Sequence, residues 1–212
     1  MSEKTIYEAL IQGGLNHIGA LAIMGNMMAE SGLRANNLQD SYNNVLGYTD
    51  EGYTLAVDGG AYSDYNFKTD SAGYGLCQWT YGPRKMNLRN FARERRTSIG
   101  DEAMQVAFCL KELKAEYYPL YNYLCSAGNL REAVERVCVE YERPAVNNIA
   151  TRHQYAIEIG QRLEAQGAAV IDSGEAEDRN EPEAVQETDY DYIADIEAHA
   201  RAIVELCGKV RG

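Results

Sequence analysis

The sequence predicts a mostly α-helical protein with some α+β character. A helical domain carries a small loop or hairpin lobe, and an acidic linker joins it to a C-terminal helix. Three observations support this. Apolar residues recur at helical spacing in several segments before residue 166. Residues 33–72 are rich in Asn, Asp, Gly, Ser and Tyr without a sustained period. Residues 167–187 are acidic and poor in aromatics. The predicted parts are therefore a domain at 1–166, a linker at 167–187 and a helix at 188–212.

The first part of the chain predicts two helices. Residues 5–12 favour a short helix that Gly13 and Gly14 end. Asn16 is the expected N-cap of a longer helix, because its side chain can accept a hydrogen bond from a free backbone N–H. Gly32 suits the position after that helix, so the helix is expected to end near Glu30. Its apolar face consists of Ile18, Leu21, Ala22, Gly25, Met28 and Ala29.

The loop-rich segment contains two short patches in which apolar and polar residues alternate, 53–57 and 62–67. Two such patches on either side of Gly59-Gly60 predict a small β-hairpin. The rest of this lobe is expected to be loop, and loops often carry binding residues.

Four further helices are predicted in the domain. Pro83 suits a first helical turn and predicts a helix to about Arg96. Residues 98–101 are expected to cap a helix over 102–115, and Pro144 to end another over 130–141. A fourth is expected over 147–166. Beyond the linker, residues 191–207 return to helical spacing, and a lone helix needs a partner. We expect it to dock on the domain, to self-associate or to bind a partner.

Composition excludes several functions. The chain has 32 acidic and 20 basic residues and a net charge of −12, without a basic stripe, which argues against nucleic-acid binding. No run of eighteen apolar residues predicts a membrane-spanning helix, and the N-terminus lacks the pattern of a secretory signal. Five cysteines without CxxC spacing favour reduced thiols. Three scattered histidines predict neither a metal site nor a cofactor.

Two motifs carry the chemistry. Residues 23–33 read IMGNMMAESGL, and residues 70–80 read DSAGYGLCQWT. Glu30 ends an apolar helix, where the negative end of the helix dipole and the apolar wall are both expected to raise the pKa of its carboxyl group. A protonated glutamate at the edge of a core is what a general acid for glycoside hydrolysis needs.

These motifs, followed by Tyr141-Glu142-Arg143-Pro144, resemble the lysozyme-like superfamily, which includes goose-type lysozymes and soluble lytic transglycosylases. The closer resemblance is to phage tail lysozymes and endolysin domains, and it spans roughly residues 5–165. It also covers Leu46 to Asp50 and Arg84-Lys85. The resemblance implies a lysozyme-like fold and a glycosidase that cuts the MurNAc–GlcNAc β-1,4 bond of bacterial peptidoglycan. Such a protein is expected to be made in the host cytoplasm and to act in lysis or from a phage tail. The partner of its C-terminal helix would then be a second copy or a phage component.

The resemblance also implies the site residues. Glu30 is the expected general acid, and Asp70 is the leading second carboxylate, with Asp58 and Asp64 as alternatives in the same lobe. Related enzymes also work with one glutamate. The expected substrate-binding residues are Ser31, Tyr74, Gln78, Trp79 and Tyr141.

Chemistry supports some of these roles. Gln78 can donate to and accept from an N-acetyl group. Trp79 and Tyr81 suit the face of a sugar ring, although core packing is an equal interpretation of Trp79, as it is of Tyr141. Glu142 and Arg143 are interpreted as a structural ion pair.

Three alternatives remain at this point. A lytic transglycosylase would use the same glutamate and release 1,6-anhydro sugars. A cysteine amidase or endopeptidase would use Cys77 as nucleophile and His153 as base. Pro83 follows Cys77 within six residues, however, so no long helix begins at the thiol. A catalytically silent tail or wall-binding module is the third, and the intact Glu30-Ser31 argues against it.

Overall fold

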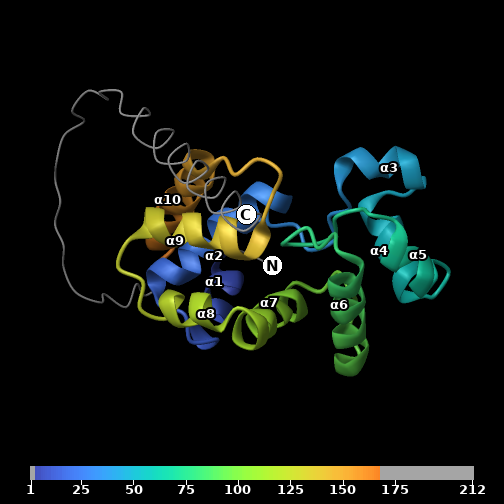
Figure 1. The fold of residues 1–212 in the computed structure, drawn as a ribbon, viewed down its shortest axis with the longest axis horizontal. Coiled ribbons are helices and arrows are strands. Elements are labelled where there is room, and N and C mark those ends of the chain that lie inside the picture. Colours follow the sequence, from blue (N-terminus) through green and yellow to red (C-terminus); the bar gives the residue numbers. More distant parts are fainter. Residues whose placement is uncertain (1–2, 168–212) are drawn as a thin grey trace, which may run out of the picture. The chain divides into compact units, whose positions relative to one another are not determined.

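The computed structural model describes residues 3–167, which form a helical domain (Figure 1). Its first six helices are α1 (Glu3–Gln12), α2 (His17–Ser31), α3 (Asp40–Leu46), α4 (Asp50–Asp58), α5 (Asp64–Thr69) and α6 (Gly82–Arg95). The others are α7 (Glu102–Glu116), α8 (Tyr118–Leu124), α9 (Leu130–Arg136), the π-helix η1 (Val137–Glu142) and α10 (Ile149–Ala165). The predicted linker beyond Gly167 and the C-terminal helix lie outside the described residues. Within 3–167, no helix is long and apolar enough to cross a membrane.

Helix α2 forms the centre of the domain. It packs against α1, α8, α9, η1 and α10. The predicted caps are confirmed: the Asn16 side chain accepts a hydrogen bond from the Gly19 N–H at 2.8 Å, and Gly32 adopts a left-handed φ of 63°. These caps place Glu30 at the end of the helix, next to Ser31 as its last residue.

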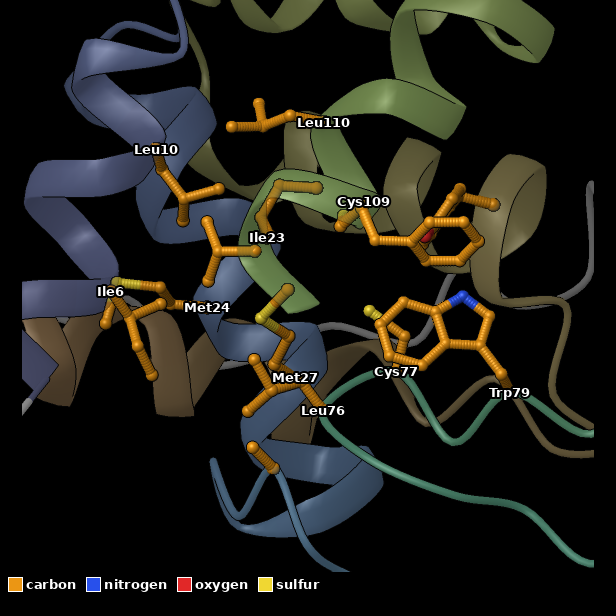
Figure 2. Packing of buried hydrophobic residues seen from close by; sticks show 14 of the residues in the cluster. Ile6, Leu10, Ile23, Met24, Met27, Leu76, Cys77, Trp79, Cys109 and Leu110 are labelled. Atoms are coloured by element: carbon orange, nitrogen blue, oxygen red, sulfur yellow. The ribbon is translucent and has the colours of Figure 1, made fainter. Parts of the chain in front are cut away.

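The hydrophobic core surrounds α2 (Figure 2). Its α2 side chains Ile23, Met24 and Met27 are at most 1 % exposed. Figure 2 shows them in one cluster with residues of α1, α7 and residues 70–80, which we call the Gly-rich segment. These residues are Ile6, Leu10, Cys109, Leu110, Leu76, Cys77 and Trp79. The second sequence motif is therefore part of the core that supports α2.

The predicted hairpin is wrong, because both of its patches are helical. Residues 53–57 lie in α4 and most of 62–67 in α5. Tyr53 and Val57 are four residues apart, so they share one face in a strand and in a helix alike. The N-caps decide the outcome: Thr49 accepts from the Gly52 N–H and Ser63 from the Asn66 N–H, both at 3.1 Å. In the described residues the only β feature is one isolated bridge.

The other predicted helices are confirmed, with one change of geometry. The helix expected over 130–141 is α9 continued by η1, in which Arg143 N–H donates to the Cys138 carbonyl at 2.8 Å. This five-residue step gives a wider turn than an α-helix, and π-helical turns occur frequently at functional sites. It brings Tyr141 and Glu142 to the end of the element. Helices α3 and α8 were not predicted.

Candidate active site

A cleft of about 880 Å³ lies beside the end of α2. Its walls come from α2, α3, the segment 71–81, the first turn of α6, the junction of α7 and α8, and residues 141–145. Three carboxylates line it: Glu30, Glu116 and Glu142. Segments far apart in the sequence therefore bring acidic groups to one cavity.

Glu30 is held in the cleft by Arg152 of α10. Arg152 Nη2 donates to Glu30 Oε1 at 2.6 Å, and the Glu30 side chain remains 18 % exposed. Arg152 is itself fixed, because it also donates to Asn26 Oδ1 at 3.1 Å and to the Asn147 carbonyl at 2.9 Å. Asn26 precedes Glu30 by four residues and so lies on the same face of α2. Sequence reasoning missed Arg152, since no local pattern links residues 122 positions apart.

Glu142 ends η1 and lines the same cleft. The ion pair expected between Glu142 and Arg143 does not form in the described structure. Arg143 Nε donates instead to the backbone carbonyl of Glu140 at 2.9 Å. The carboxylate of Glu142 is therefore not neutralised by its neighbour in the sequence.

The environment of Glu142 favours its protonated form. Burial raises the pKa of Glu142 well above its usual range. The negative charge of Glu30 raises this pKa further, as does Cys109, while Arg84 and Arg152 lower it. Glu30 and Glu142 thus act on each other electrostatically.

The structure argues against Asp70 as the second catalytic carboxylate. Its side chain is 2 % exposed and is absent from the cleft walls. Lys85 Nζ lies 2.5 Å from Asp70 Oδ1, and the hydroxyls of Tyr53 and Tyr62 donate to Oδ2 at 2.5 and 3.3 Å. A carboxylate whose two oxygens are already bound in the core is a structural group.

The two alternative acids of this lobe are also bound elsewhere. Asp58 accepts from the Ser98 hydroxyl at 2.5 Å and from the Ile99 N–H at 3.0 Å. Asp64 forms a two-pronged ion pair with Arg93. Neither residue lines the cleft.

Trp79 and Tyr141 meet at a buried glutamate that sequence reasoning did not single out. Trp79 Nε1 and the Tyr141 hydroxyl donate to Glu112 Oε2 at 2.9 and 2.7 Å. Arg84 adds two hydrogen bonds of 2.8 Å to the same carboxylate. Both aromatic residues are 1 % exposed, so Trp79 packs in the core and this burial argues against it as a sugar platform. Tyr141 reaches the cleft wall with its hydroxyl already bound.

The remaining substrate-binding candidates mostly support the cleft. Ser31 is buried and its hydroxyl donates to the carbonyls of Met27 and Leu76 at 3.0 Å, which ties α2 to the Gly-rich segment. Tyr74 is fully buried, and its hydroxyl shares a 2.6 Å hydrogen bond with Thr54. Direct contact of Ser31 and Tyr74 with substrate is therefore not supported.

Gln78 and Tyr81 do face the cleft. Gln78 Nε2 donates to Asn37 and to the Gly75 carbonyl, which fixes the segment that forms the cleft wall. Tyr81 is 69 % exposed and lines the cleft together with Tyr42 and Tyr117. These tyrosines, rather than Trp79, offer aromatic surface to a ligand.

The environment of Cys77 does not suit a nucleophile. Burial raises the pKa of its thiol well above the usual value, and the hydrogen bond to Cys109 raises it further. A protonated thiol attacks poorly. The proposed base, His153, lies on α10, where burial and Arg131 lower its pKa.

Within 3–167, no group of three His, Cys, Asp or Glu residues suits a metal ion.

Comparison with known protein families gives a match. The family described as phage tail lysozyme matches residues 2–163, which include the described helices and the cleft. A search of the curated proteins finds no match to this chain.

Proposed function

This chain belongs to the phage tail lysozyme family, and we propose that it cleaves the β-1,4 bond between MurNAc and GlcNAc with Glu30 as the general acid. A lysozyme-like, peptidoglycan-degrading function follows from the family. The bond and the acid are the proposal. We also propose that it acts in phage lysis or in wall penetration from a tail.

The position of Glu30 carries the proposal. Cleavage of a glycosidic bond needs a proton donor beside the leaving oxygen. Glu30 stands at the end of a buried helix, faces the cleft with part of its side chain exposed, and is held by Arg152 at 2.6 Å. A carboxyl group fixed in this way on a rigid element can hold one orientation toward a bound glycan.

The cleft suits a carbohydrate. Its volume of about 880 Å³ lies within the roughly 300–1,000 Å³ of ordinary ligand sites. The Tyr81 ring is exposed on its wall, and sugar rings present apolar faces that pack on aromatic rings. We propose that Tyr81, with Gln78 beside it, contacts the glycan.

Mass spectrometry of digested, purified peptidoglycan tests the proposal. We expect new reducing ends on MurNAc, because hydrolysis adds water across the cleaved bond. Products ending in 1,6-anhydro-MurNAc would instead indicate a lytic transglycosylase that uses the same glutamate. Free amino groups without new reducing ends would contradict a glycosidase and favour an amidase or endopeptidase.

A further inference from the structure

We propose that Glu142 is the second catalytic carboxylate of this site and serves as the base that activates the attacking water. The inference rests on the proposed glycosidase function. It gives Glu142 the role of second carboxylate, which the sequence analysis expected Asp70 to have.

The arrangement of the cleft supports this role. Glu30 lies in the last turn of α2 and Glu142 ends η1, and these two elements pack against each other. Both side chains line the same cavity, and the charge of Glu30 acts on Glu142. The third acid of the lining, Glu116, is exposed at the end of α7.

Glu142 is also unusual in its lack of partners. Within residues 3–167, no hydrogen bond or ion pair forms to its carboxylate. Two fully buried acids of the domain differ: Asp70 is bound by Lys85 and two tyrosines, and Glu112 accepts four hydrogen bonds. A partly buried carboxylate without a partner is costly to a fold, which suggests that its partner is the water or substrate in the cleft.

The electrostatic environment of Glu142 sets the condition for this role. Burial and Glu30 raise the pKa of Glu142, and a carboxylate with a raised pKa is a better proton acceptor than an ordinary one. Arg84 and Arg152 oppose this shift without cancelling it, so Glu142 serves as a base only at a pH above its raised pKa.

The reaction then balances. Water loses one proton to the Glu142 carboxylate while its oxygen forms a bond to the anomeric carbon of MurNAc. The bond from that carbon to the GlcNAc oxygen breaks, and this oxygen takes the proton of Glu30. Attack by water opposite to the leaving group gives a product of inverted configuration.

Azide distinguishes a catalytic base from a structural residue, because azide attacks without losing a proton. The experiment compares the full-length wild type, Glu142→Ala, Glu142→Gln and Glu30→Gln on purified peptidoglycan, with and without sodium azide. Glu140→Gln is the matched control, since Glu140 lies on η1 but pairs with Arg136 at 2.6 Å outside the cleft. Thermal unfolding by circular dichroism shows which variants fold.

We expect Glu142→Ala to lose at least about a hundredfold in the release of reducing ends. Azide should restore chain cleavage and yield α-muramyl azides, detected by mass. If the alanine variant does not fold, Glu142→Gln takes its place in the test. We expect it to show the same loss of reducing-end release and the same azide product. Azide should not restore Glu30→Gln, which lacks the proton donor, and Glu140→Gln should match the wild type.

Near-normal activity of a folded Glu142 variant would overturn the inference, as would a loss that azide does not repair. Anhydro products from the wild type would also overturn it, because water would not be the nucleophile. Failure of the proposed function has a different signature: the wild type itself would release neither reducing nor anhydro ends.

Discussion

At the scale of single residues, the acids of this domain divide by their partners. Asp70 and Glu112 lie in the core with their oxygens fully engaged, whereas Glu30 and Glu142 reach the cleft. Asp70 is followed by the Gly-rich motif and so attracted a catalytic interpretation. Its position in the structure instead explains Lys85, a lysine that is 0 % exposed and needs a counter-charge.

Replacement of this structural acid tests the division. Asp70→Asn should remove the counter-charge of Lys85 and cost roughly 3–5 kcal/mol of stability, which lowers Tm by on the order of 10 °C. Activity per folded molecule at low temperature should stay within a few-fold of the wild type. Asp40→Asn is the control, because Asp40 is 86 % exposed and its nearest cation is 3.6 Å away. An Asp70→Asn protein with normal Tm and no activity would restore the catalytic interpretation.

The candidate site was only partly predictable from residue types. Glu30 was singled out because its position follows from a local pattern, a helix that Gly32 ends. Trp79 and Tyr74 were expected to bind substrate but are buried in the core. The sequence could not distinguish the two roles, because an aromatic residue beside glycines is typical of a core and of a sugar-binding wall alike. Arg152 could not be found at all, since its contact with Glu30 depends on how α10 packs on α2.

At the scale of elements, the helices were predictable where caps and periodicity agree. Asn16, Pro83 and Asp101 all stand where the sequence placed them. The hairpin prediction failed because patches of five and six residues are too short to distinguish the period of a strand from that of a helix. The capping residues Thr49 and Ser63 were the better signal. The π-helical turn of η1 was not predicted, because the spacing of apolar residues over 130–141 indicated only an ordinary helix.

The packing of α10 on α2 gives a prediction at this scale. A Cβ at Gly25 would lie 2.6 Å from the Arg152 carbonyl and 2.8 Å from the Ala156 Cβ. Gly25→Ala should push α10 away, cost about 1–3 kcal/mol, and reduce activity by moving Arg152 from Glu30. Denaturant unfolding and the reducing-end assay measure both effects.

A matched glycine controls for the added methyl group. At Gly128, a Cβ would have no atom of another residue within 4 Å beyond its chain neighbours, so Gly128→Ala should change neither stability nor activity appreciably. Equal behaviour of the two variants would contradict a role for close α2–α10 packing in positioning Arg152.

At the scale of the whole molecule, the described domain brings three distant parts of the chain to one cleft: the end of α2, the Gly-rich segment and the end of η1. The sequence motifs mark these same three parts, which is why the family and the class of activity could be predicted. The division of labour among the acids could not, because it depends on which carboxylates the fold buries with partners.

The release of reducing ends by Glu30→Gln from purified peptidoglycan tests the central claim most directly. The substitution keeps the shape of the side chain and removes its proton, and Glu158→Gln, on the surface of α10, is the matched control. We expect Glu30→Gln to remain folded, with a Tm lowered by the loss of the charge that pairs with Arg152, and to lose at least about a hundredfold in activity. A folded Glu30→Gln protein that releases reducing ends at the rate of Glu158→Gln would contradict the account.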